Sequence, residues 1–293
     1  MTNSSMNQQQ AEPFKVATIQ PFDPHSREDN GRMQAGAWDL VRRACDAGAT
    51  LVVLPEYFNV MGISATAVHE VIESTGTQVE LAQRICEERS VWLLLPLIEQ
   101  RGERRYNCAH LFDPGGNVVH TYDKTHLTIS ETRDYELTAG EDITTVDTSL
   151  CRIGVMICYD IYFPEVARVL ALQGVQLILF PSLQRSDVEA STMLFNRVRA
   201  MDAQSYLVRS SFGQPRGSAY KPGMMYGGSC VIAPDGSILA SAGRHEGFAT
   251  AVIDPHTPWQ RQRCGGMGPQ PVAQFLNEDR RPERYGPISR PPG

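Results

Sequence analysis

Short apolar runs recur along the chain and predict strands, several of them buried on both faces. Runs of roughly four to eight mostly apolar residues, bounded by Gly, Pro or polar turn residues, are typical of such strands. One pair of runs flanks Asp113-Pro114-Gly115-Gly116, which predicts a hairpin. The predicted strands span residues 14–20, 51–54, 91–98, 106–112, 118–122, 152–158, 177–180, 206–210, 229–233, 237–241 and 248–253.

Segments with helical periodicity lie between these runs. In the first of them, Trp38, Val41 and Cys45 share a face, and Gly48 suits a C-terminal cap. Because helices and strands alternate without a regular βαβ repeat, and hairpins intrude, we expect two mixed sheets packed together with helices outside. The predicted helices span residues 35–48, 77–90, 166–173 and 186–203, the last opened by a capping box of Ser186 and Glu189.

The composition is that of a globular protein with a sizeable core. The chain has 293 residues, of which 42% are hydrophobic and 20% charged, enough for one large α/β domain. We expect a disordered N-terminus over residues 1–13 and one domain over residues 14–264. Residues 265–293 are rich in Gly, Pro and Arg, and we expect an extended tail that packs on the body or on a partner subunit.

Charge and hydropathy argue against two classes of partner. The net charge is −6 and there is no block of Lys and Arg, so nucleic acid is not expected as a partner. No apolar run reaches the ~18 residues of a membrane-spanning helix. The first ten residues also lack the basic and apolar regions of a signal peptide.

The cysteines do not form a disulfide or zinc pattern. Their number is seven, which is odd, and their spacing is irregular, so a reducing cytoplasmic compartment is expected. There is no Cys-x-x-Cys pair, and the seven histidines are scattered along the chain. We therefore expect no metal site.

A residue with acid–base or nucleophilic chemistry follows each of three predicted strands. Glu56 comes after Leu51–Pro55, Lys124 comes after the hairpin, and Cys158 comes after Gly154–Ile157. A strand-to-helix turn at Cys158 would expose the thiol and direct backbone N–H groups at the reacting atom. Charged groups at such positions lie at strand ends or in pockets, where their pKa values shift.

A cysteine, a glutamate and a lysine together can carry out acyl transfer. A thiol needs a base or a positive neighbour to become a nucleophile. A carboxylate can take its proton, and a lysine can stabilise the oxyanion of a tetrahedral intermediate. The sequence therefore predicts an acyl-transfer site that needs neither a metal nor an organic cofactor.

The stretches around these three residues resemble the nitrilase superfamily of carbon–nitrogen hydrolases, which carries Glu, Lys and Cys in this order. The resemblance covers residues from about 14 to 287. It rests on Leu54-Pro55-Glu56, Tyr122-Asp123-Lys124-Thr125-His126-Leu127 and Ile157-Cys158-Tyr159-Asp160, with further similarity at Phe163-Pro164-Glu165, Phe180-Pro181-Ser182, Arg199-Ala200-Met201-Asp202 and Arg280-Arg281-Pro282-Glu283.

This resemblance implies an α/β fold, a four-layer α-β-β-α sandwich of two mixed sheets, usually paired into a homodimer or a higher homo-oligomer. It implies that Glu56 is the general base, Lys124 the oxyanion stabiliser and Cys158 the nucleophile. The backbone N–H of Tyr159 would complete the oxyanion hole. Cys158 would attack an amide carbon and release ammonia, and water would then hydrolyse the thioester.

Many members of the superfamily carry a second glutamate after the lysine, about seven residues before a glycine. Here that spacing from Gly140 falls on Arg133. Glu131 lies two positions away and is assigned as the second catalytic carboxylate, with Glu136 as the alternative. Because the spacing departs from the usual one, a catalytically silent interaction protein stays open as another class of function.

The residues after the cysteine favour one branch of the superfamily. Cys158-Tyr159-Asp160 resembles the amidase branches, which implies hydrolysis of a small carboxamide to an acid and ammonia. The alternative is an N-carbamoyl amine or amino-acid amidohydrolase that also releases carbon dioxide, and a nitrilase is less favoured. His126 is expected to pack rather than to form a Cys–His dyad. The candidate substrate contacts are Tyr57, Tyr159, Tyr162, Ser182, Gln184 and Arg185.

Overall fold

The computed structural model describes residues 12–68, 72, 75–184, 189–218, 227–262 and 268–290. The chain divides into two units, Met1–His256 and Thr257–Gly293. Most of the predicted disordered N-terminus, together with Ser186 and Arg185, lies outside the described residues. No described helix combines the length and the hydropathy needed to cross a membrane.

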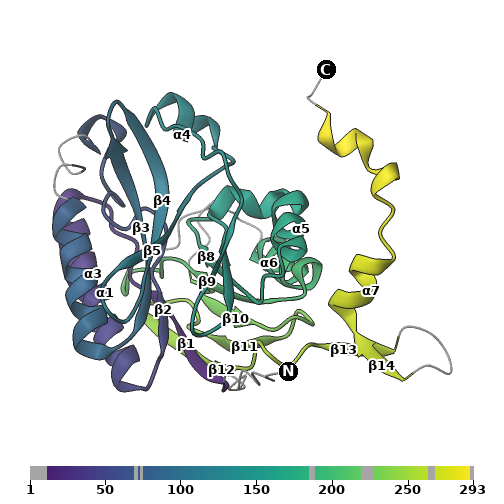
Figure 1. Cartoon of the computed structure of the whole chain (residues 1–293). Coiled ribbons are helices and arrows are strands. Elements are labelled where there is room, and N and C mark those ends of the chain that lie inside the picture. The colour runs from purple at the N-terminus through teal and green to yellow at the C-terminus, as the bar shows by residue number, and fades with distance from the viewer. Residues whose placement is uncertain are drawn as a thin grey trace, which may run out of the picture. The chain divides into compact units, whose positions relative to one another are not determined.

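Two mixed sheets of six strands each form the centre of the first unit, as far as it is described (Figure 1). In the first sheet the order is β12 (Gly247–Ile253), β1 (Phe14–Gln20), β2 (Leu51–Val53), β3 (Trp92–Arg101), β4 (Arg104–Phe112) and β5 (Val118–Asp123). In the second sheet the order is β11 (Ile238–Ser241), β10 (Cys230–Ile232), β9 (Tyr206–Ser210), β8 (Leu177–Pro181), β7 (Arg152–Val155) and β6 (Thr145–Asp147).

Both sheets combine parallel and antiparallel pairs. In the first sheet β1, β2 and β3 are parallel, whereas β12, β4 and β5 pair antiparallel to their neighbours. In the second sheet β7, β8 and β9 are parallel, with antiparallel strands at both edges. The predicted mixed sheets are therefore confirmed.

The side-chain alternation of the strands separates three layers of apolar core. Val53 and Leu179, from opposite sheets, belong to the core between the sheets. Val52, the neighbour of Val53, packs with residues of helices α1 (Arg27–Asp46) and α3 (Thr75–Arg89). On the other side, Ile178 packs with residues of α5 (Pro164–Leu172) and α6 (Glu189–Ala203).

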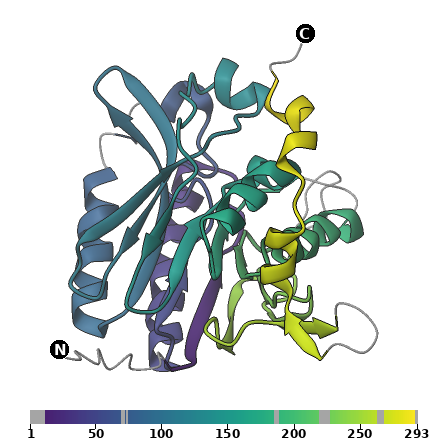
Figure 2. The ribbon, with the colours of Figure 1, turned by 45° about the vertical axis from the view of Figure 1, so that its right-hand side comes forward.

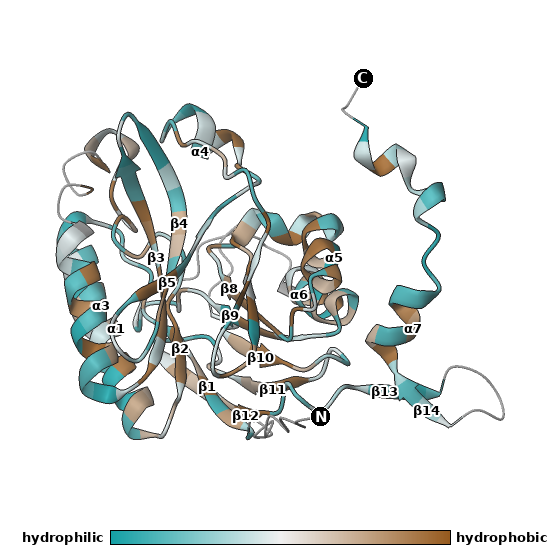
Figure 3. Ribbon diagram, in the orientation of Figure 1, coloured by the Kyte–Doolittle hydropathy of each residue, from teal (hydrophilic) through white to brown (hydrophobic). Residues whose placement is uncertain are grey.

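These cores define the predicted four-layer α-β-β-α sandwich. Figure 1 shows α1 and α3 outside one sheet and α5 and α6 outside the other, and Figure 2 shows the same order from a second direction. Hydrophobic residues gather on the central strands, while the helices carry a hydrophilic stripe as well (Figure 3). The fold class expected from the sequence is confirmed.

The structure differs from the predicted elements mainly at their ends. Helix α1 begins at Arg27 rather than at residue 35, because its first turns are polar and are initiated by Ser26, whose side chain accepts a hydrogen bond from the Asp29 N–H. The strand predicted over 152–158 ends at Val155. The short elements β6 and α4 (Ile129–Arg133) were not predicted, because they are too short to show a period.

The second unit carries secondary structure of its own. Its hairpin pairs β13 (Gln260–Gln262) with β14 (Pro269–Pro271). Helix α7 (Val272–Glu278) follows, with short 3₁₀ turns at Pro282–Arg284 and Gly286–Ser289. The packing of this tail on the body or on a partner subunit stays a prediction.

Candidate active site

A cavity of about 690 Å³ opens where residues just beyond four strand ends come together. Two of these strands, β2 and β5, belong to the first sheet, and two, β7 and β8, belong to the second. The site therefore forms only when the two sheets are packed together. Among its lining residues are Glu56, Lys124, Glu131, Cys158, Tyr159 and Leu183.

Cys158 occupies a strained turn at one wall of this cavity. It is the first residue of a 3₁₀ helix, η2 (Cys158–Tyr162), and its φ of 44° lies in the left-handed region. Non-glycine residues adopt this region rarely and at an energetic cost, often at functional sites. Residue Cys158 is partly exposed, and the neighbouring Glu56 carboxylate adds to the effect of burial in raising the pKa of its thiol. The elbow expected from the sequence is thus present.

Lys124 lies buried between two carboxylates. Its Nζ is 3.0 Å from Glu56 Oε1 and 2.7 Å from Glu131 Oε1, and its side chain is only 1% exposed. Burial alone would lower the pKa of this ammonium, but the negative charges of Glu56 and Glu131 outweigh burial and raise it. Lys124 therefore stays positively charged at neutral pH.

Glu131 is fixed by a capping box at the start of α4. Thr128 is the N-cap, and its N–H donates to Glu131 Oε2 at 2.7 Å. The other oxygen, Oε1, accepts from Tyr57 Oη at 2.7 Å as well as from Lys124. Burial would raise the pKa of Glu131, but Lys124 and these hydrogen bonds lower it, so the group is an anion.

The structure distinguishes between the two candidates for the second carboxylate. Glu131 lies in the cavity wall, in contact with Lys124. Glu136 is exposed and pairs with Arg105 at 2.9 Å, and it is not among the residues that line the cavity. The geometry brings only Glu131 to the site.

Asn107 and Leu183 complete the polar shell, and neither was predicted from the sequence. Asn107 Nδ2 donates to Glu56 Oε1 at 2.8 Å and to Glu131 Oε1 at 2.9 Å, so it joins the two carboxylates. The Leu183 N–H donates to Glu56 Oε2 at 2.8 Å. Asn107 shares its face of β4 with Ala109 of the inter-sheet core. The sequence signal for Asn107 was a polar residue at an inward position of a predicted strand, because buried polar groups need hydrogen-bond partners.

Asp160 ties the elbow to the loop that carries Lys124. Its Oδ2 accepts from the Ile157 N–H at 2.9 Å and from Tyr122 Oη at 2.9 Å. Its Oδ1 accepts from the His126 N–H and from Thr125 Oγ1, both at 3.1 Å. Because Asp160 is fully buried, these donors depend on it to satisfy their hydrogen bonds.

His126 takes part in packing and does not face the cavity. Its ring stacks on Phe163, with ring centroids 3.8 Å apart, and its Nδ1 lies 2.9 Å from Asp160 Oδ1. It is not among the residues that line the cavity. This placement agrees with the expectation that His126 forms no dyad with Cys158.

The predicted substrate contacts are placed differently from one another. Tyr57, Tyr159, Tyr162 and Gln184 line the cavity. Ser182 is fully buried outside the lining, where its Oγ accepts the Gln184 N–H at 3.1 Å. Arg185 lies outside the described residues. A further stretch of the wall was not predicted from the sequence; it comprises Asp23, Pro24, His25, Met61, Gly62 and Ile63.

Asp160→Asn is expected to destabilise the fold. The amide would place an NH₂ group against a donor at one of the two oxygen positions, so at least one buried donor would lose its acceptor. The loss should be about 1–3 kcal/mol in the free energy of unfolding. Denaturant unfolding followed by circular dichroism measures it.

Asp147→Asn is the matched control for this change. Asp147 is 74% exposed and pairs with Arg152 on the surface. Its replacement should change the stability by less than about 1 kcal/mol. Equal losses in the two variants would contradict the role of Asp160 as a buried acceptor.

Comparisons with known proteins identify the family of this chain. The sequence model of the carbon–nitrogen hydrolase family matches residues 15–259. The omega-amidase of Homo sapiens is 31% identical over 253 residues, which cover 82% of this chain and 88% of that protein. An omega-amidase of Xenopus laevis is 30% identical over 251 residues, with the same coverage.

A solved structure with a similar fold is that of an enzyme whose active-site residue is a cysteine. It is a mutant amidase from Nesterenkonia sp. AN1 that shows Michael addition of acrylamide at the active-site cysteine. It is 25% identical with a TM-score of 0.70, over 82% of this chain and 93% of that chain. With the family match covering most of the chain, and with a Glu, a Lys and a Cys gathered in one cavity, this protein belongs to the carbon–nitrogen hydrolase family.

Proposed function

We propose that the protein hydrolyses a small carboxamide to the corresponding acid and ammonia, through a thioester on Cys158 and without a cofactor. The observation that carries this proposal is the contact of the Cys158 thiol with a buried carboxylate that is itself paired with a buried ammonium. The omega-amidase and amidase relatives support an amide as the substrate.

In the first stage the thiol attacks the amide carbon. Burial and then the Glu56 charge raise the pKa of Cys158, so the resting thiol keeps its proton. Glu56 takes this proton as the carbon–sulfur bond forms, and the carbonyl electron pair moves to oxygen. When the intermediate collapses, the carbon–nitrogen bond breaks and Glu56 returns the proton to the departing ammonia.

Lys124 is suited to stabilise the oxyanion. An ammonium has three donors, and two of them bind Glu56 and Glu131. The third is available to the oxyanion, together with the backbone N–H of Tyr159. Both groups are held in place before the substrate arrives, so the negative charge develops next to donors that need no reorganisation.

In the second stage water attacks the thioester carbon and the thiol leaves. We assign the base of this stage to Glu56 as well, because Glu56 is the carboxylate in contact with the Cys158 sulfur. Glu131 accepts from Tyr57, Asn107, Lys124 and the Thr128 N–H. It is therefore a positioning residue that keeps Lys124 charged and fixed.

Cys158→Ala is expected to abolish ammonia release, because the alanine has no nucleophile. A screen over aliphatic, amino-acid-derived and aromatic amides, with ammonia as the readout, measures this loss. In the unchanged protein, mass spectrometry after rapid acid quenching should show one acyl group on Cys158. Ammonia release by the Cys158→Ala variant would refute the assignment of Cys158 as the nucleophile. If only carbamoyl compounds are hydrolysed, with release of carbon dioxide, the assignment of a carboxamide substrate would be refuted.

Glu131→Gln is expected to slow both stages in the same proportion. The neutral amide removes one of the charges that hold Lys124, and a misplaced catalytic group lowers rates by up to about a hundredfold. Single-turnover kinetics with mass detection should show the same maximal fraction of thioester as in the unchanged protein, reached more slowly. Glu136→Gln is the control and should leave the rates unchanged. Selective accumulation of the thioester would make Glu131 the base of the second stage instead.

Glu56→Gln is expected to lower the pKa of the Cys158 thiol. Burial comes first among the causes that raise this pKa, and the Glu56 charge adds to it, while Lys124 opposes both. Without that charge the thiolate forms at lower pH. The rate of Cys158 alkylation by iodoacetamide, followed by peptide mass across a pH series, should rise at lower pH than in the unchanged protein. A profile that moves to higher pH would contradict the assignment.

Two further expectations stay predictions. The first is a homodimer or higher homo-oligomer. It is supported by apolar side chains exposed on η2, α5 and α6, elements that pack against one another; these side chains are Tyr162, Leu172, Leu194 and Met201. The second expectation is a cytoplasmic location.

A further inference from the structure

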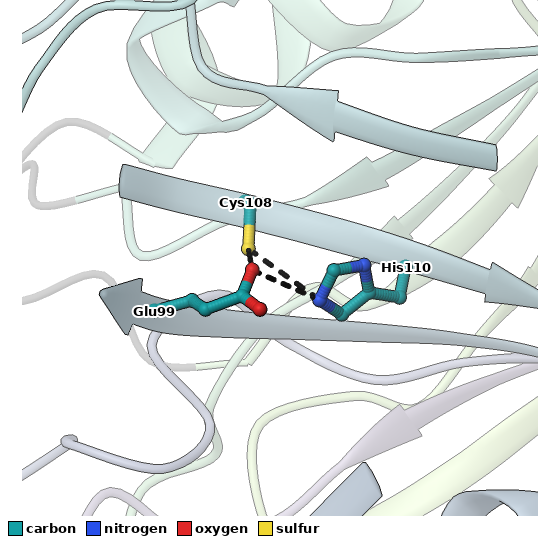
Figure 4. Close-up of side chains that lie close together, drawn as sticks. All are labelled: Glu99, Cys108 and His110. Carbon is teal, nitrogen blue, oxygen red and sulfur yellow. Dashed lines mark hydrogen bonds and ion pairs between the residues drawn. The ribbon is translucent and has the colours of Figure 1, made fainter. Parts of the chain in front are cut away.

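A second cluster of reactive side chains lies on the face of the first sheet that turns away from the active site. Glu99 comes from β3, and Cys108 and His110 come from β4. Successive strand residues point to opposite faces, so Cys108 lies on the helix-covered side while its neighbour Asn107 faces the active site. Figure 4 shows the three side chains pointing toward one another.

The three ligand atoms have the spacing of a tetrahedral metal site. Glu99 Oε2 lies 3.3 Å from Cys108 Sγ and 3.2 Å from His110 Nε2. The sulfur and Nε2 are 3.8 Å apart. Around zinc, bonds of about 2.0–2.3 Å at tetrahedral angles hold such atoms about 3.3–3.6 Å apart. A metal ion can therefore be bound with little movement of the side chains.

The histidine is oriented as metal-binding histidines are. Its Nδ1 lies 2.9 Å from Thr121 Oγ1 on β5, which leaves Nε2 directed at the other two ligands. Such a hydrogen bond from the second ring nitrogen is typical of metal sites. Nε2 also faces a carboxylate oxygen, so either an N–H hydrogen or a metal ion lies between them.

The charge and exposure of the cluster suit a divalent cation with an open ligand position. A thiolate, a carboxylate and a neutral imidazole together balance a charge of +2. Cys108 is fully buried, whereas the Glu99 side chain is 27% exposed, so water can reach the fourth position. The Arg101 guanidinium pairs with Asp123, and its Nε also lies 3.5 Å from Glu99 Oε2, so metal binding exchanges this second contact for a bond to the ion.

We propose that Glu99, Cys108 and His110 bind one Zn²⁺, with water as the fourth ligand. Zinc accepts sulfur, nitrogen and oxygen ligands together, and its binding releases the thiol proton. No metal site was expected from the sequence. The proposed ligands show no local pattern, because Cys108 and His110 are two residues apart on β4 and Glu99 comes from the neighbouring strand β3. That spacing differs from the Cys-x-x-Cys pairs that mark many zinc sites in a sequence.

Bound zinc would tie together the strands that supply the active site. Cys108 pairs with Asp123 across β4 and β5, and the Lys124 N–H donates to the Asn107 carbonyl at 2.9 Å. The metal would therefore hold β3 and β4 next to the point where Asn107 and Lys124 leave the sheet. We expect one equivalent of Zn²⁺ to raise the unfolding temperature.

Titration with Co²⁺ tests the site, because cobalt reports its ligands spectroscopically. The metal-free full chain should bind one Co²⁺ with a thiolate-to-cobalt charge-transfer band and tetrahedral visible bands. Cys108→Ala should remove the charge-transfer band, and His110→Asn should weaken binding. Cys86→Ala, which changes another buried cysteine, and Cys158→Ala, which changes the active site, should both keep the band.

Thr121 separates a metal site from a purely hydrogen-bonded cluster. Thr121→Val should weaken Co²⁺ binding about tenfold by removing the partner of His110 Nδ1, and Thr121→Ser should restore it. If Cys108→Ala fails to fold, the loss of affinity in Glu99→Gln decides in its place. Absence of a thiolate band with excess Co²⁺, or a band lost only in Cys158→Ala, would overturn the proposal.

Discussion

The burial of Lys124 between Glu56 and Glu131 is the interaction on which the rest of the site depends. An isolated charge in a protein interior is costly, and a buried pair is tolerated only when its remaining donors and acceptors are also satisfied. Asn107 and the Leu183 N–H meet this need for Glu56. The polar shell therefore exists because three charges are held out of water, and the same isolation strengthens their effect on a reacting thiol.

This charge cluster also explains why two sheets are needed. The Glu56 and Lys124 loops leave the first sheet, while the Cys158 elbow and Leu183 leave the second. Neither sheet alone brings an acid–base group to the sulfur. The apolar core between the sheets fixes their separation, and Asp160 joins the two loops directly through hydrogen bonds to both. Packing and catalysis thus rest on the same contacts.

The sandwich and the three central residues can be predicted from the sequence because each strand, helix and central residue has a recognisable local sequence pattern. Glu56 and Cys158 follow apolar runs, and such runs are readable one segment at a time. Asn107 is found only once β4 is known to face the other sheet. The choice between Glu131 and Glu136 depends on a single helical turn, in which Thr128 turns one glutamate inward. Local patterns identify elements, whereas pairing between distant segments decides which polar residues meet.

Because β4 is pleated, its two faces carry residues with different chemical roles. Asn107 serves the cavity on one face, and Cys108 joins Glu99 and His110 on the other. A shift of pairing by a single residue would exchange these faces, taking the amide out of the active site and sending a thiol into it. Insertions and deletions within this strand are therefore far less tolerable than substitutions. The evolutionary freedom of this region should lie in the loop at its tip, at Asp113–Asn117, where a change in length leaves the parity of the strand intact.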